Sequence, residues 1–78
     1  MTKSTLKKVQ KILQSIYEET GNLIIIQLNI SQDIVRYNVI TYNSFKMPSE
    51  PEEIDYYDEN AIIDYLNQLE QKLKNDVL

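Results

Sequence analysis

Apolar residues in the first twenty positions recur with the spacing of a helix. Six of them follow the i, i+3, i+4, i+7 pattern that places side chains on one helical face: Leu6, Val9, Ile12, Leu13, Ile16 and Tyr17. Ser4 or Thr5 is a suitable N-cap, and Gly21 suits the left-handed conformation that ends many helices. The pattern predicts an amphipathic helix over residues 4–19.

The next two segments, 22–30 and 34–43, are rich in the β-branched and aromatic residues that favour strands. A tight connection around residues 31–33 joins them into an antiparallel hairpin. One register aligns apolar side chains on a single face, and a slip by one residue would place polar side chains there instead. That register pairs Ile24 with Thr41, Ile26 with Val39, Leu28 with Tyr37, and Ile30 with Val35.

The opposite face of this hairpin is polar near the turn and apolar near its base. The apolar half, called the outer patch below, consists of Leu23, Ile25, Ile40 and Tyr42. An antiparallel sheet with one solvated face does not normally place four large apolar side chains on that face. We expect the outer patch to be covered, either by the acidic connector that follows the hairpin or by a second subunit, in which case it is a homodimer interface.

Residues 44–59 form a connector, because Pro48 and Pro51 oppose a helix or a central strand there. Residues 54–57 can add a short edge strand. Residues 60–77 then predict a second helix, capped by Asp58 or Asn60, with an apolar stripe of Ile62, Ile63, Leu66, Leu69, Leu73 and Val77. The predicted fold is a single α+β domain over residues 1–78, a two-layer sandwich of order α-β-β-(β)-α with both helices on one sheet face.

Composition argues against most kinds of chemistry. The 78 residues include no cysteine, no histidine and a single glycine, Gly21. Cys/His zinc sites, the usual nucleophile–base pairs and glycine-rich phosphate loops all require residues that are missing. The carboxylates lack the spacing and the glycine of an EF-hand loop. We therefore predict no catalytic residue, no cofactor and no metal site, and a protein that is not an enzyme.

The hydropathy of the chain predicts a cytoplasmic protein without membrane contact. The longest apolar run is Leu23–Ile26, far short of the roughly 20 residues that a membrane span requires. The first twenty residues alternate polar and apolar positions, so they lack the apolar core of a signal peptide. The absence of cysteine also fits a reducing compartment.

Charge is segregated along the chain, whose formal net charge is −4. Six of the 12 acidic residues fall within ten positions, around two tyrosines: Glu50, Glu52, Glu53, Asp55, Tyr56, Tyr57, Asp58 and Glu59. Tyrosine is enriched at protein interfaces, and carboxylates steer association with basic surfaces. We predict that this acidic segment docks on a basic protein surface, the alternative being a solvated loop.

The lysines collect near the N-terminus, at Lys3 directly before the first predicted helix and at Lys7, Lys8 and Lys11 within it. Such a cluster can contact phosphates, although amphipathic helices commonly carry charge on their solvent side. The net negative charge disfavours a nucleic-acid-binding protein. Direct nucleic-acid binding is therefore less favoured than either docking on a basic protein or homodimer formation.

No motif places the chain in a family. In size, acidity and order of elements it is similar to small inhibitor proteins of phages and mobile elements, such as anti-CRISPR proteins and DNA-mimicking inhibitors. Its richness in Ile, Asn, Lys and Tyr is typical of low-GC bacteria and their phages. The similarity implies an inhibitor that binds a nucleic-acid-processing protein; the alternative is a small homodimeric structural or regulatory protein.

Overall fold

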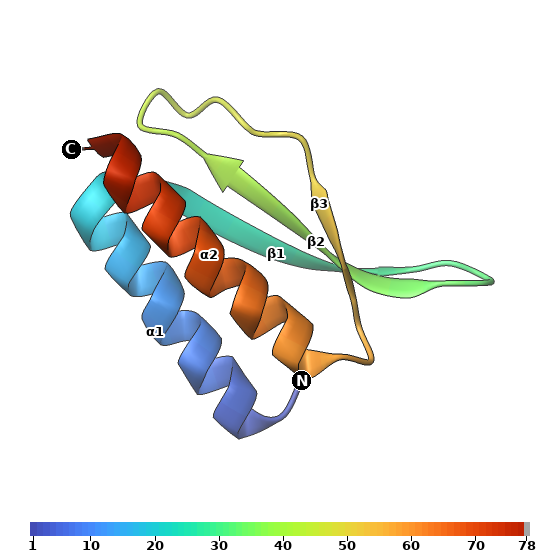
Figure 1. Ribbon diagram of the computed structural model, residues 1–78. Helices are drawn as coiled ribbons and strands as arrows, with labels where there is room; N and C mark the ends of the chain where they lie inside the picture. The colour runs from blue at the N-terminus through green and yellow to red at the C-terminus, as the bar shows by residue number, and fades with distance from the viewer. Residues whose placement is uncertain (78) are drawn as a thin grey trace.

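The computed structural model describes the backbone of residues 1–77 and the side chains of residues 1–76, so the predicted apolar position Val77 lies outside the described side chains. Five elements follow one another: α1 (Lys3–Thr20), β1 (Leu23–Ile30), β2 (Val35–Tyr42), β3 (Glu52–Asp55) and α2 (Glu59–Val77). The strands form one antiparallel sheet in the order β1-β2-β3, and the two helices lie side by side against it (Figure 1). The predicted α+β class is confirmed.

Local signals set the ends of α1. Thr2 is the N-cap, and its hydroxyl accepts a hydrogen bond from the Thr5 backbone N–H at 3.2 Å. The helix therefore begins one residue before the predicted start, and the predicted caps Ser4 and Thr5 lie inside its first turn. Gly21 ends the helix with φ 75°, and its N–H donates to the Tyr17 carbonyl. Because this left-handed conformation strains residues with a Cβ, glycine is the favoured residue there.

The predicted hairpin register is confirmed at all four apolar pairs, from Ile24–Thr41 to Ile30–Val35. A third strand is also present, but it covers Glu52–Asp55 and not residues 54–57. The reason is local. The Asp55 carboxylate accepts a hydrogen bond from the Tyr57 backbone N–H at 2.8 Å, which turns the chain out of the sheet directly after Asp55.

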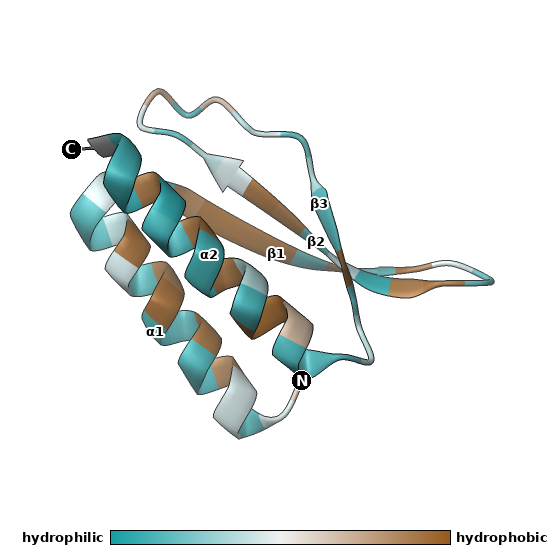
Figure 2. Cartoon of the chain, viewed as in Figure 1, coloured by the Kyte–Doolittle hydropathy of each residue, from teal (hydrophilic) through white to brown (hydrophobic). Residues whose placement is uncertain are grey.

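The core lies between the helices and one face of the sheet. It combines two residues of α1, four from the three strands and two of α2: Val9, Ile16, Ile24, Tyr37, Val39, Ile54, Ile62 and Leu66. The apolar stripes of the two helices face each other and the sheet (Figure 2). Burying these side chains is the main stabilising contribution expected for a domain of this size.

The hairpin extends beyond the helices, and its tip projects away from the rest of the molecule (Figure 1). Leu28 and Ile30 point to the helix-covered side of the sheet, yet they are 52% and 68% exposed. The two side chains therefore point to the predicted face of the sheet, but they are not buried there, because the helices cover only the base of the hairpin. At the margins of the α1 stripe, Leu6 and Tyr17 are also exposed.

Across residues 1–77, neither helix combines the length and the apolar character needed to cross a membrane.

Candidate binding surfaces

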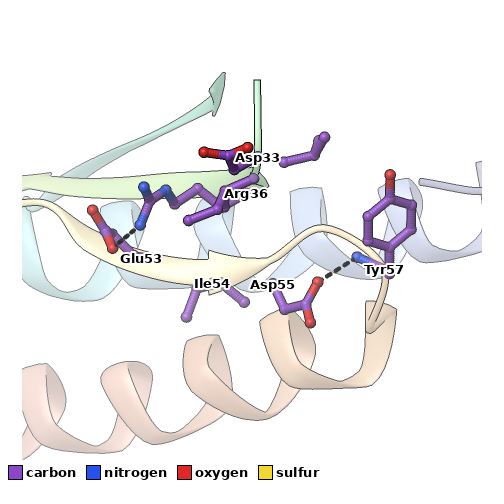
Figure 3. A pocket seen from close by; sticks show the side chains of 8 residues that line it. Asp33, Arg36, Glu53, Ile54, Asp55 and Tyr57 are labelled. Atoms are coloured by element: carbon purple, nitrogen blue, oxygen red, sulfur yellow. Dashed lines mark hydrogen bonds and ion pairs between the residues drawn. The ribbon is translucent and has the colours of Figure 1, made fainter. Parts of the chain in front are cut away.

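A hollow of about 390 Å³ lies where β3 ends and the hairpin tip continues alone (Figure 3). Three carboxylates, an arginine, an exposed tyrosine and three aliphatic residues line it. We call this site the acidic hollow; it is lined by Asp33, Ile34, Val35, Arg36, Glu53, Ile54, Asp55 and Tyr57. The site forms because β3 pairs with β2 only as far as Arg36, which leaves the residues before Arg36 without a neighbouring strand on that side.

Tyr57 is the most exposed aromatic group at the acidic hollow, at 78%. The hydrogen bond between its N–H and Asp55 fixes the turn that carries it. Its ring meets the Tyr56 ring edge-on, with centroids 5.3 Å apart, and Tyr56 packs in turn against Tyr37 at 5.3 Å. The chain of three rings holds an exposed aromatic side chain on a rigid base, an arrangement suited to an interface contact.

The acidic hollow is electrostatically negative. Its three carboxylates, Asp33, Glu53 and Asp55, face one guanidinium, Arg36, which leaves a net charge of −2 on the lining. Arg36 forms an ion pair with Glu53 across the β2–β3 pair (Figure 3). Asp33 has no structural partner among the described residues, and Asp55 uses one of its oxygens for the turn. Carboxylate oxygens therefore remain available to accept hydrogen bonds from a cationic side chain.

The structure divides the predicted acidic segment. It brings Glu53, Asp55 and Tyr57 together at the acidic hollow. Tyr56 is partly buried against the core, and Glu50 and Glu52 are exposed along the edge outside the hollow. The remaining two acidic residues, Asp58 and Glu59, take part in building α2.

Asp58 and Glu59 have structural partners. The Asp58 carboxylate accepts from the Ala61 backbone N–H at 3.2 Å and so caps α2, one of the two predicted caps. Glu59 joins the two helices: it accepts from the Thr2 backbone N–H at 2.8 Å and from the Thr5 hydroxyl at 3.0 Å. These two hydrogen bonds lower the pKa of Glu59 below its ordinary value. The presence of both acidic residues is thus explained by their hydrogen bonds within the fold, without a binding partner.

Five residues of the acidic hollow were not identified as binding residues from the sequence: Asp33, Ile34, Val35, Arg36 and Ile54. Asp33 and Ile34 belong to the turn of the hairpin and reach the site only because β3 runs antiparallel to β2. An available signal was Ile34 itself, which is a large apolar residue beside a tight turn, where polar residues prevail. In the structure it is 45% exposed.

The outer patch remains open. Leu23 and Ile25 are 49% and 37% exposed, while Ile40 and Tyr42 are partly buried. The connector runs beside β2, where the Ser49 N–H donates to the Thr41 carbonyl at 2.8 Å, and it leaves Leu23 and Ile25 exposed. Its residues Ser44 and Lys46 lie at the border of the patch.

The base of the outer face is hollowed next to this patch. The hollow measures about 490 Å³ and is lined by Tyr17, Gly21, Leu23, Ile25, Tyr42, Asn43, Ser44 and Lys46. A turn organised by Asn43, whose side-chain oxygen accepts from the Phe45 and Met47 N–H groups, borders it. The turn exposes both Phe45 and Met47. The surface is apolar, and nothing about its charge selects one kind of partner.

The four lysines of the predicted cluster, Lys3, Lys7, Lys8 and Lys11, are all exposed on α1. Three of them border a shallow stretch of helix surface together with glutamine and serine side chains. No aromatic side chain lines that stretch, so it lacks the stacking groups that single-stranded nucleic-acid sites use.

Within the described residues, no group of three or more Asp, Glu, His or Cys side chains is arranged to hold a metal ion. No family model, no curated protein and no solved structure matches the chain.

Proposed function

We propose that the chain is a non-enzymatic protein-binding module whose partner presents a basic surface. The observation that carries the proposal is that Asp33, Glu53 and Asp55 line one hollow together with aliphatic side chains and the exposed Tyr57. A lining that combines carboxylates with aliphatic groups suits an arginine or lysine side chain, which has an apolar stem and a cationic end.

Charge complementarity selects this class of partner. The net charge of −2 on the lining attracts a cationic surface and repels an anionic one, so it favours encounter with basic proteins. Where the basic surface of the partner normally holds nucleic acid, the carboxylates would occupy the place of phosphates, and binding would inhibit. The cysteine-free sequence suits a cytoplasmic partner.

The test compares charge reversal at the hollow with the same reversal elsewhere. The variant Asp33→Lys/Glu53→Lys changes two lining residues and leaves the Asp55 turn intact, whereas Glu18→Lys/Asp64→Lys changes two exposed residues of the helices. Each protein is used to capture partners from the native host at about 50 mM salt, and the captured partner is then titrated against all three proteins.

We expect the wild type and the helix variant to bind the same basic protein, with affinity that falls as salt rises, and the hollow variant to lose it. Tyr57→Ala should weaken binding at every salt concentration, because it removes an apolar contact and not a charge. Binding that survives charge reversal at low salt would refute the proposal, as would a captured partner without a basic surface.

A further inference from the structure

The sheet has a second free edge, along β1. Among the described residues no strand pairs with β1 on the side away from β2. The strand is eight residues long, Leu23–Ile30, and carries no charged residue and no proline. Strand edges that stay exposed to solvent are usually short, charged or interrupted by proline, because unpaired backbone groups recruit other strands. β1 has none of these protections.

The hydrogen bonds of β2 show which backbone groups of β1 point outward. The Val35 carbonyl accepts from the Tyr56 N–H, and the Thr41 carbonyl from the Ser49 N–H, so both residues direct their backbone away from β1. Their register partners, Ile30 and Ile24, must therefore direct their own N–H and C=O groups to the free edge. By alternation, the free edge presents the backbone groups of Ile24, Ile26, Leu28 and Ile30.

The side chains of these four residues lie on the helix-covered face, but the cover is uneven. Ile24 is buried and Ile26 partly buried in the core that α1 and α2 complete. Leu28 and Ile30 extend past the helices and are exposed. The helices thus cover the first half of β1, at Ile24 and Ile26, and leave the second half, at Leu28 and Ile30, exposed.

We propose that β1 pairs with β1 of a second copy of this chain, antiparallel, to form a continuous six-stranded sheet. The pairing that uses all four outward-facing residues places the two-fold axis beside Gln27, with Ile26 opposite the partner's Leu28 and Ile24 opposite the partner's Ile30. The bare half of each strand then lies beside the half that the partner's helices cover. Leu28 and Ile30 then gain apolar neighbours, the partner's Ile26 and the partner's Ile24, without any change in the fold.

The chemistry of the strand argues for a second copy over a different partner. Its side chains are all uncharged, so two identical strands meet without like-charge repulsion, and on the helix-covered face each apolar residue lies opposite an apolar residue. The same symmetric pairing at β3 would bring glutamates and aspartates of two copies together. The dimer leaves both acidic hollows at the far ends of the sheet, where two partner sites remain open, and it does not depend on the function of those hollows.

Sedimentation equilibrium over about 5–500 μM protein tests the proposal, since a dimer of this kind is in exchange with its monomer. Leu28→Lys places a charge at the centre of the pairing and should weaken dimerisation at least about tenfold. Ile34→Lys is the matched control: it also adds a lysine at an exposed apolar position of the hairpin tip, but on the β2 side. It should leave the dimer intact, and circular dichroism verifies that each variant is folded.

Hydrogen exchange supplies a second measurement that needs no substitution. The amides of Leu28 and Ile30 point away from β2 and should exchange freely in a monomer, while in the dimer they should be protected increasingly with concentration. A protein that remains monomeric at about 500 μM would overturn the proposal. So would a dimer that survives Leu28→Lys and is split by Ile40→Lys in the outer patch, because the interface would then be the sheet face.

Discussion

The two free edges of the sheet are built in opposite ways. The β3 edge is four residues long, follows Pro48 and Pro51, and carries Glu52, Glu53 and Asp55. The β1 edge is twice as long and uncharged. Both edges belong to the same three-stranded sheet and flank the same central strand, so the difference lies in the sequence of each strand and not in the topology.

This difference indicates how each edge is used. Charges, proline and short length prevent a strand from pairing with another chain; β3 is short and charged, and it directly follows Pro51. An acidic edge can still bind a basic side chain, because that contact needs carboxylates and not a backbone ladder. β3 is thus suited to side-chain recognition, and β1 to strand pairing. One chain of 78 residues can hold two separate binding surfaces in this way.

The contrast between the two edges is tested most directly by a substitution that releases β3 from the sheet. Ile54 is the one residue of β3 whose side chain is buried, so Ile54→Ala should cost about 2–4 kcal/mol of unfolding free energy. Without its anchor β3 should detach, which would also dismantle the acidic hollow. Urea denaturation measures the loss of stability, and hydrogen exchange at Glu52–Asp55 reports the strand.

The control for that prediction is Ile34→Ala, which removes the same atoms from an exposed position and should cost well under half as much. Equal losses for the two variants would show that β3 is not held by its single buried residue. The pairing of β3 with β2 would then rest on the backbone ladder alone.

A smaller effect is expected at Glu59, the carboxylate that joins the two helices and does not line the β3 edge. Glu59 accepts hydrogen bonds from Thr2 and Thr5, which lower its pKa. A group with a lowered folded-state pKa stabilises the fold above its ordinary value of 4.5, and this contribution disappears as pH falls through the lowered pKa. Glu59→Gln should therefore destabilise the protein at neutral pH, and its difference from the wild type should shrink below about pH 4.5.

Urea denaturation from about pH 7 to pH 3 provides the measurement. Asp64→Asn is the control, since it neutralises an exposed carboxylate of the same helix. Stability curves for Glu59→Gln and the wild type that stay parallel over the whole range would mean that Glu59 contributes nothing as a charge.

Much of this comparison was accessible from the sequence. The two-residue alternation of the hairpin favoured the observed register, because a slip by one residue would mix polar side chains into the apolar face. The α1 and α2 stripes predicted which face the helices cover. The exposure of Leu28 and Ile30 was not predictable in the same way. An alternating pattern reports the direction of a side chain, whereas its coverage depends on where the helices end relative to the strand.

The acidic hollow was only partly predictable, for a related reason. Glu53, Asp55 and Tyr57 lie in one short acidic run, so the local composition was enough to predict them as binding residues. Asp33 and Ile34 join them through the pairing of β3 with β2. A strand of four residues with one buried side chain carries too little pattern to predict that register. The turn made by Asp55 shifted the strand by two residues from its predicted position.

The smallest change in stability, and the sharpest test of the comparison, comes from removing charge at the β3 edge. In Glu52→Thr/Glu53→Thr both side chains are exposed, and the Arg36–Glu53 ion pair lies at the surface, so unfolding free energy should change by no more than about 1 kcal/mol. Association should change much more, because threonine favours strands and no longer repels a second edge. Sedimentation at high concentration should then show species larger than those of the wild type, since each copy now has two edges able to pair. Glu18→Thr/Asp64→Thr, with the same loss of charge on the helices, should not form them. If both variants sediment like the wild type, acidic side chains are not what keeps β3 unpaired, and the short length of the strand must suffice.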